Sequence, residues 1–440
     1  MKKSLKTSIA IALVVALSGC GAFKGGQKKT PTLGSRVPIL VAENGAEVDK
    51  SIADVQVLLP PPAANVDWAQ PGGNAAKSMG HVALGTGMTR LWSASIDGGS
   101  VRQRLGAAPV VADNKLFAVD VDAVAHAFAA DTGKLLWSAK LIENKDNRAA
   151  RFGGGISYDD GKVFATTGLG DIVALNAADG AVLWRAHPAG PLRGAPTVAN
   201  GALYIVSQNN ELVALSQADG SIQWTGSGSL ESQGVFGVGA PAAGRGTIVA
   251  GFSSGELYAY RYENGRVLWT EVLSRTSVST SVSSLTDIDA APVIDQNRVY
   301  AVGEGGRMVS LELTTGQRVW EQNLAGVSTP WIAGEWLFVV TEDAKLYCLS
   351  RANGKIRWIS DLGGFKNVKK RKNPIHWSGP VLAGDQLILL NSEGQIVPVS
   401  PATGQKGEII KGSSAFSLPP LVANNILYTI DSKGRISAYR

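Results

Sequence analysis

The sequence predicts an all-β protein, an eight-bladed β-propeller made of four-stranded antiparallel blades. The first observation is a recurring pair, Pro109 and Trp137 in one copy, whose members stand 28 residues apart (109 to 137). The second is a glycine four residues before each tryptophan position, Gly133 in this copy. Between the ends of the pair, short alternating apolar runs separated by turn residues are typical of four strands in one meander. Repeats of about 45 residues with four strands each indicate a propeller.

The unit recurs seven times with no insertion inside it. Five copies keep both ends, and two keep the spacing with one end replaced, by Ile156 for the proline and by Glu408 for the tryptophan. The pairs are Pro109 and Trp137, Ile156 and Trp184, Pro196 and Trp224, Pro241 and Trp269, Pro292 and Trp320, Pro330 and Trp358, and Pro380 and Glu408. Because the glycine suits a hairpin turn with positive φ, the same turn is expected in every copy.

The eighth blade is predicted to be composite. Residues 90–96 form a lone predicted strand with Trp92 at the tryptophan position, whereas the last repeat, 420–440, has runs for only three strands. If 90–96 supplies the missing outer strand, the ring closes without a free edge where its ends meet. The seven tryptophans are then expected on outer strands, packed between neighbouring blades as structural core.

The N-terminal segment is predicted to carry a leader. Lysines precede the apolar run 9–17, which is too short to span a bilayer as a helix. The run ends in Leu-Ser-Gly-Cys20, which resembles the lipobox of bacterial lipoproteins and implies removal of residues 1–19 and lipidation of Cys20. Gly21 stands where an Asp would resemble the inner-membrane retention signal, so the resemblance implies the periplasmic face of the outer membrane. An ordinary signal with an incidental cysteine is the alternative.

A tether is expected between the leader and the folded body. Residues 20–62 are rich in Gly, Lys, Pro, Ala and Val without a sustained period, which predicts a lipidated cysteine and a flexible chain ahead of a propeller over 63–440. The formal net charge is +6, and three of these charges belong to the leader. The mature chain is therefore mildly cationic, and export argues against nucleic acid as a partner.

No catalytic, cofactor-binding or metal site is predicted. The segment from Gly251 to Gly255 matches the G-x-S-x-G pattern of a nucleophile elbow, but that elbow needs a strand–turn–helix and these glycines fall in a β-turn of a blade. The four histidines are scattered, with no pair at metal-ligand spacing. Cys348 has no partner once Cys20 is lipidated and is expected to be a buried free thiol.

The motif Ala-Ala-Asp-Thr-Gly-x-x-x-Trp at 129–137, with degenerate copies elsewhere, resembles the repeats of the quinoprotein propeller superfamily. Its enzymes hold pyrroloquinoline quinone with calcium and usually carry a Cys-Cys pair and long insertions, which this chain lacks. A bare propeller with a lipobox instead resembles the BamB family of outer-membrane lipoproteins. That resemblance implies a scaffold without cofactor that binds the periplasmic POTRA domains of BamA. Exposed sheet edges or an apolar channel surface are further expected to hold nascent β-barrel proteins by strand addition. A quinone-dependent dehydrogenase and a scaffold of another envelope complex are the alternatives.

The links between repeats carry the candidate partner-binding residues. From the tryptophan position to the next proline position the links vary from 10 residues (320 to 330) to 23 (269 to 292), and they are expected to share one face of the ring. The longest contains Leu285, Asp287 and Asp289, which resemble the family's BamA-binding stretch. The link before Pro241 contains Val235 and Phe236 in place of the family's partner-binding loop. For the two aspartates, a solvated loop capped by backbone hydrogen bonds is the alternative.

A basic run stands out in the link between Trp358 and Pro380. Its core is Lys369-Lys370-Arg371-Lys372. Such a run can contact anionic lipid headgroups or an acidic partner surface. A solvated loop is the alternative interpretation.

Overall fold

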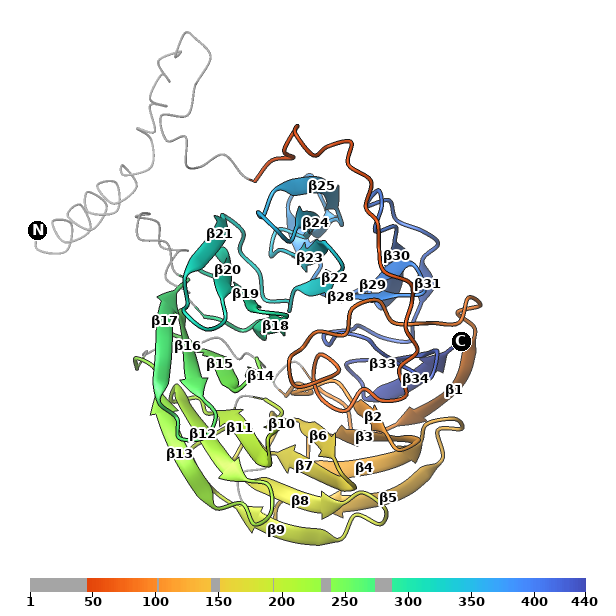
Figure 1. Ribbon diagram of the computed structural model, residues 1–440. Helices are drawn as coiled ribbons and strands as arrows, with labels where there is room; N and C mark the ends of the chain where they lie inside the picture. Colours follow the sequence, from red (N-terminus) through yellow and green to blue (C-terminus); the bar gives the residue numbers. More distant parts are fainter. Residues whose placement is uncertain (1–45, 101–102, 144–150, 193, 231–238, 274–286) are drawn as a thin grey trace, which may run out of the picture. The chain divides into compact units, whose positions relative to one another are not determined.

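Eight four-stranded antiparallel sheets surround a central axis (Figure 1). The computed structural model describes residues 46–100, 103–143, 151–192, 194–230, 239–273 and 287–440, and the residues from 46 on belong to one compact unit. The described residues form strands, turns and loops, with no helix among them and hence none that could span a membrane. The predicted eight-bladed propeller is confirmed.

Each blade is a meander, with its first strand nearest the axis. The first four blades are blade 1, with β2 (Val110–Ala112), β3 (Lys115–Val119), β4 (Val124–Ala129) and β5 (Leu135–Lys140); blade 2, with β6 (Ile156–Asp159), β7 (Lys162–Thr166), β8 (Ile172–Asn176) and β9 (Val182–Ala186); blade 3, with β10 (Thr197–Ala199), β11 (Ala202–Val206), β12 (Glu211–Ser216) and β13 (Ile222–Ser227); and blade 4, with β14 (Ala242–Gly244), β15 (Thr247–Gly251), β16 (Glu256–Arg261) and β17 (Val267–Val272).

The remaining blades follow the same order. They are blade 5, with β18 (Val293–Asp295), β19 (Arg298–Val302), β20 (Met308–Glu312) and β21 (Arg318–Gln322); blade 6, with β22 (Trp331–Ala333), β23 (Trp336–Val340), β24 (Lys345–Ser350) and β25 (Ile356–Asp361); blade 7, with β28 (Trp377–Ala383), β29 (Gln386–Asn391), β30 (Gln395–Val399) and β31 (Ile410–Lys411); and blade 8, with β32 (Leu421–Ala423), β33 (Ile426–Ile430), β34 (Arg435–Tyr439) and β1 (Arg90–Ser95). A separate hairpin, β26 (Phe365–Asn367) and β27 (Lys372–Pro374), lies between blades 6 and 7.

The N-terminal strand completes the last blade, as predicted. β1 pairs antiparallel with β34, and Trp92 lies opposite Ala438 in the ladder. β34 is therefore flanked by strands on both sides instead of lying at a sheet edge, which closes the ring between the ends of the chain.

All seven repeat tryptophans bridge to the following blade. Each Nε1–H donates to a backbone carbonyl in or beside the turn between the third and fourth strands of that blade, at 2.8 to 3.2 Å. The repeat glycines occupy the same turns with φ between +67° and +77°, as the turn prediction required. Their Cα atoms lie beneath the indole rings, so the tryptophans pack between blades as expected.

The loss of the tryptophan at Glu408 has a structural reason. Glu408 lies on the outer side of blade 7, and the following blade is the composite one. Because β1 supplies the fourth strand of blade 8 from the other end of the chain, that blade has no turn between its third and fourth strands. A tryptophan at position 408 would therefore have neither the glycine nor the carbonyl that receive the other seven.

An N-terminal segment, residues 65–82, contacts the inner side of every blade. Backbone or side-chain hydrogen bonds of 2.6 to 3.2 Å connect it to each blade in turn. The contacts are Trp68 with Val111, Ala69 with Tyr158, Gln70 with Val198, Ala75 with Ala243, Ala76 with Ile294, Gly80 with Trp331, Val82 with Leu382, and Asn65 with Val422. This inner segment thus connects the innermost strands of all eight blades.

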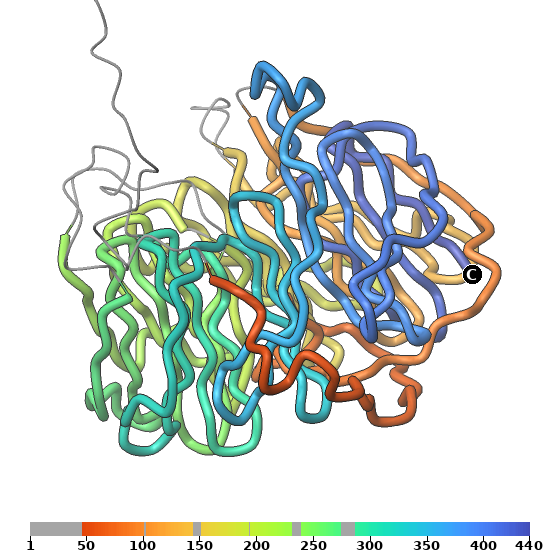
Figure 2. The backbone as a smooth tube through the Cα atoms, turned by 90° about the horizontal axis from the view of Figure 1, so that it is seen from above, coloured from red at the N-terminus to blue at the C-terminus, as the bar shows by residue number. Residues whose placement is uncertain are grey.

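Residues 46–62, the described part of the predicted tether, lie along blade 6. The Asp49 N–H donates to Ile356 O at 2.9 Å, and Arg357 Nε donates to Val55 O at 2.6 Å. Val57 is buried. This part of the chain is therefore packed on the outer strand β25 and runs along one side of the ring in Figure 2.

Candidate functional site

The links that join successive blades lie on the same face of the ring as the turns between the second and third strands of each blade. This face is here called the link face. The described end of the longest link, 287–292, rests on two such turns: the Ile288 N–H donates to Phe252 O of blade 4 at 3.2 Å, and the Glu304 N–H of blade 5 donates to Asp287 O at 2.9 Å. A link and the second-to-third turns of its two flanking blades are therefore bonded together, which is the arrangement expected from the strand directions.

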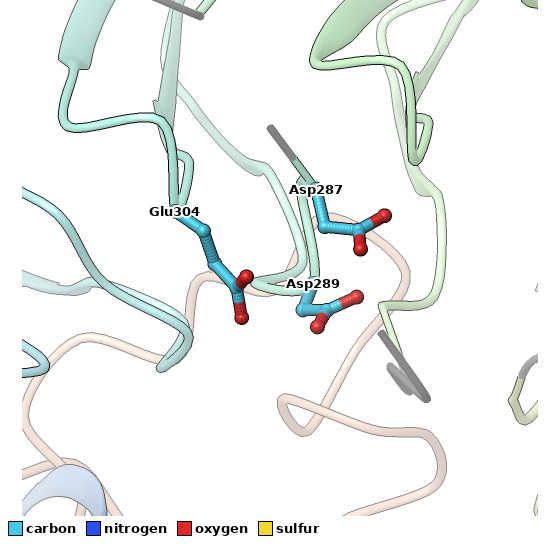
Figure 3. A group of neighbouring side chains, drawn as sticks. All are labelled: Asp287, Asp289 and Glu304. Carbon is cyan, nitrogen blue, oxygen red and sulfur yellow. The ribbon is translucent and has the colours of Figure 1, made fainter. Parts of the chain in front are cut away.

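Three carboxyl groups gather at this point (Figure 3): Asp287 and Asp289 from the link and Glu304 from the turn between β19 and β20. Their ligand oxygens all lie within 4.8 Å of one another. Asp287 is 1% exposed and Asp289 7%, whereas Glu304 is partly exposed. Three carboxylates so close together attract a cationic side chain or a hard metal ion, since oxygen ligands suit such ions.

The sequence placed Asp287 and Asp289 on a partner-binding loop but did not find Glu304. No local pattern could have found it, because Glu304 precedes two glycines in an ordinary turn and joins the aspartates only through the packing of blades 4 and 5. Of the other predicted partner-binding residues, Leu285, Val235 and Phe236 lie outside the described residues, as does Cys20.

The basic run forms the hairpin β26–β27, in which Asn367 pairs with Lys372. All residues from Lys366 to Lys372 are exposed. The basic run is therefore a short, exposed strand pair whose backbone is paired at Phe365–Pro374 and at Asn367–Lys372.

Aliphatic side chains exposed on the outer strands form a feature that the sequence prediction missed. They stand one or two residues before the repeat tryptophans and are 38 to 53% exposed. This aliphatic belt comprises Leu91, Leu135, Leu136, Val182, Leu183, Ile222, Val267, Leu268 and Val319. The signal was present in the sequence, since an apolar doublet before a tryptophan breaks the alternation of a half-buried strand.

In blade 6 the position two residues before the tryptophan is covered by another part of the chain. The residue there, Ile356, is only 2% exposed, because the chain's own residues 46–57 lie over β25. The equivalent Ile222 of blade 3 is 53% exposed. An outer strand of this propeller can therefore be covered by another segment of chain, which in blade 6 turns at residues 50–54.

The residues that resemble catalytic motifs have structural roles. Ser253 lies in the turn between β15 and β16 and is buried, and its N–H donates to Asn210 Oδ1 at 3.0 Å. Cys348 is a buried free thiol, as expected, and burial raises its pKa far above the usual range. The β-turn context expected for the serine motif is confirmed.

A family model described as outer membrane protein assembly factor BamB matches residues 76–148 and 121–360. The chain belongs to the BamB family. It is 30% identical to BamB of Salmonella typhimurium over 355 residues, which cover 80% of this chain and 88% of that relative. It is 31% identical to BamB of Escherichia coli over 346 residues, covering 77% and 85% of the two chains.

Solved structures of known proteins share the fold of this BamB family member. The crystal structure of BamB from Moraxella catarrhalis matches with a TM-score of 0.67 at 18% identity, covering 80% of this chain and 99% of that one. A quinohemoprotein alcohol dehydrogenase from Comamonas testosteroni matches with a TM-score of 0.66 at 13% identity, covering 86% and 81%. At these identities the similarity shows the fold alone, and the relatives of higher identity carry the assembly-factor name.

Proposed function

We propose that this protein is a periplasmic scaffold lipoprotein of the machinery that assembles β-barrels in the outer membrane. Membership of the BamB family carries this proposal. The mechanism is binding without chemistry: a ring of eight blades holds loops and edges in fixed relative positions. The lipid on Cys20 anchors the chain to the periplasmic face of the outer membrane.

The partner on the link face is the POTRA region of BamA. The acidic cluster supports this assignment, since Asp287, Asp289 and Glu304 hold three carboxyl groups within one small area. Leu285, Val235 and Phe236 add apolar contacts from the same link and from the one before it. Because Asp287 and Asp289 are both buried, the partly exposed Glu304 is the carboxylate that a cationic residue of the partner reaches first.

Nascent β-barrel proteins are the second class of partner, bound as extended segments along the aliphatic belt. Strand addition to a sheet edge supplies main-chain hydrogen bonds, and alternate side chains fill apolar sites. The covering of Ile356 by residues 46–57 supports binding at this position, because there an outer strand of the same ring packs against another segment of chain.

Copurification from membranes tests the proposal as a whole. The full chain, tagged at its C-terminus and extracted in mild detergent, is expected to bring BamA with it in near-stoichiometric amount. A preparation in which the lipidated chain is abundant and BamA is absent would contradict the proposed complex. Reconstitution with pyrroloquinoline quinone and calcium tests the dehydrogenase alternative, and neither cofactor binding nor dye reduction is expected.

A further inference from the structure

The hairpin β26–β27 is a rigid basic tip. Its base is fixed by Ile375 N–H donating to Gly364 O at 2.9 Å and by Trp377 Nε1–H donating to Gly363 O at 3.0 Å. In Figure 2 the hairpin stands beyond the neighbouring blades. Because its geometry is set before any partner arrives, little conformational entropy is lost when the tip binds.

The charges at the tip are available to a partner. Lys366 is paired with Glu393, at 2.7 Å between Nζ and Oε2. Lys369, Lys370, Arg371 and Lys372 form no ion pair with any carboxylate in the part of the chain that the structure describes. Four neighbouring cations on one turn therefore face solvent.

The tip also exposes one aliphatic residue. Val368 is 74% exposed and directly precedes the four cations. On the other side of the turn, the Arg371 guanidinium lies 5.4 Å from the centre of the Phe365 ring. An acidic protein surface would match the cations, but it would also need an apolar pocket beside its carboxylates to receive the exposed valine. An anionic bilayer surface satisfies both, because lysine and arginine bind phosphate headgroups while the aliphatic side chain enters the interfacial region.

We propose that the tip of β26–β27, residues 368–372, binds the surface of a membrane that contains anionic phospholipid. This inference rests on the proposed lipid anchor for its cellular setting. Residues 21–45 lie between Cys20 and the described chain, and an extended chain of this length spans up to roughly 80 Å. The hairpin follows β25, the strand on which residues 46–57 are packed, so an anchored chain could bring this tip to the bilayer.

The tip orients the ring as well as adding affinity. A lipid at the end of a long tether only limits how far the propeller can move from the bilayer. A second contact at β26–β27 sets which side of the propeller faces the bilayer. Each basic residue near an anionic surface strengthens binding by about fivefold, so four together give on the order of several hundredfold at low salt. The attraction weakens at high salt because the Debye length falls to about 3 Å at 1 M.

Vesicle cosedimentation tests the proposal. Residues 21–440, which keep the whole compact unit and lack the leader and Cys20, are mixed with vesicles of phosphatidylcholine alone or of equal parts phosphatidylcholine and phosphatidylglycerol. Binding is expected only to the anionic vesicles and is expected to be lost in high salt. The variant K369Q/K370Q/R371Q/K372Q should bind at least tenfold more weakly, and V368S a few-fold more weakly.

A matched control removes the same charge elsewhere. The variant K134Q/R266Q/K411Q/K433Q neutralises four exposed cations on other blades and should bind within about twofold of the wild type. Equal loss in both quadruple variants, or binding of the wild type to neither vesicle, would overturn the membrane assignment. Loss of BamA copurification in the hairpin variant with unchanged vesicle binding would also overturn it, in favour of an acidic protein partner. Retained copurification with lost vesicle binding is the expected combination.

Discussion

The indole ring of Trp137 in blade 1 lies directly over Gly180 in blade 2. A Cβ atom on Gly180 would stand 2.7 Å from Cε3 of Trp137, and Trp137 Nε1–H donates to Ala177 O at 3.2 Å. Glycine is therefore required at this turn for two reasons, its positive φ and the closeness of the ring. The same contact recurs at seven of the eight blade boundaries, so it sets the spacing of the ring.

Gly180→Ala is expected to destabilise the protein by about 2–4 kcal/mol, since it adds both backbone strain and overpacking. Gly161→Ala is the matched control: its φ is +73°, close to the +77° of Gly180, but nothing lies within 4 Å of the added Cβ. This control should lose only about 1 kcal/mol. Denaturant unfolding measures both, and equal losses would show that the Trp137 contact contributes nothing.

The inner segment should contribute strongly to stability through Gln70. Its side chain donates to Val198 O and accepts from Val198 N–H, both at 2.9 Å, and it is 6% exposed. Gln70→Ala leaves both backbone groups of Val198 unpaired, which is expected to cost about 2–4 kcal/mol. Gln223→Ala, at an exposed position, should change the free energy of unfolding by less than about 0.5 kcal/mol. A Gln70 variant as stable as the wild type would argue against a structural role of the segment.

Lys77 makes stability depend on pH. The side chain is 2% exposed, Nζ donates to Thr197 Oγ1 at 3.0 Å, and burial lowers the pKa from the ordinary 10.5 to about 7. Between pH 7 and 10.5 the unfolded chain therefore binds more protons than the folded one, so the stability of the wild type rises with pH across this window. Below pH 7 both states are protonated, and the full cost of burying the charge is present.

Lys77→Met removes this cost and is expected to stabilise the protein most at pH 7 and below. The advantage of the variant should shrink by up to about 1.4 kcal/mol per pH unit as the pH rises toward 10. Unfolding midpoints from pH 6 to 10 measure it, with the exposed Lys134→Met as control. A constant difference between variant and wild type over this range would contradict the buried-amine explanation.

The aliphatic belt is expected to bind extended apolar segments. The variant L135S/V182S/I222S/V267S removes one exposed aliphatic residue from each of blades 1 to 4 and should weaken binding of a labelled peptide with alternating apolar residues at least fivefold. V66S/L230S/V327S removes exposed aliphatic residues elsewhere and should leave the affinity within about twofold. Fluorescence anisotropy measures both affinities, and equal weakening would mean that the contact is unspecific.

The sequence was sufficient for the architecture, because the residues that set it act locally. Gly133 needs a positive φ in its own turn, and Trp137 stands at a constant distance from it, so the blade count and the closure by 90–96 could be predicted. Contacts made across blades left no such pattern. Glu304 joins the acidic cluster only through the packing of its blade. The inner segment bonds to the blades mainly through backbone groups, which every residue type has, so its sequence carries no sign of these contacts.

The most direct test of the scaffold proposal is a titration of the BamA POTRA region into residues 21–440 by calorimetry. D287N/D289N is expected to weaken binding at least tenfold, and E304Q to weaken it to a smaller degree. The control D113N/D385N changes exposed carboxylates in turns between first and second strands, and its affinity should stay within about twofold of the wild type. Because Asp287 and Asp289 are buried, the unfolding midpoint of each variant is measured alongside, and E304Q serves if the double variant does not fold. Wild-type affinity in folded D287N/D289N and in E304Q would contradict docking through the link face.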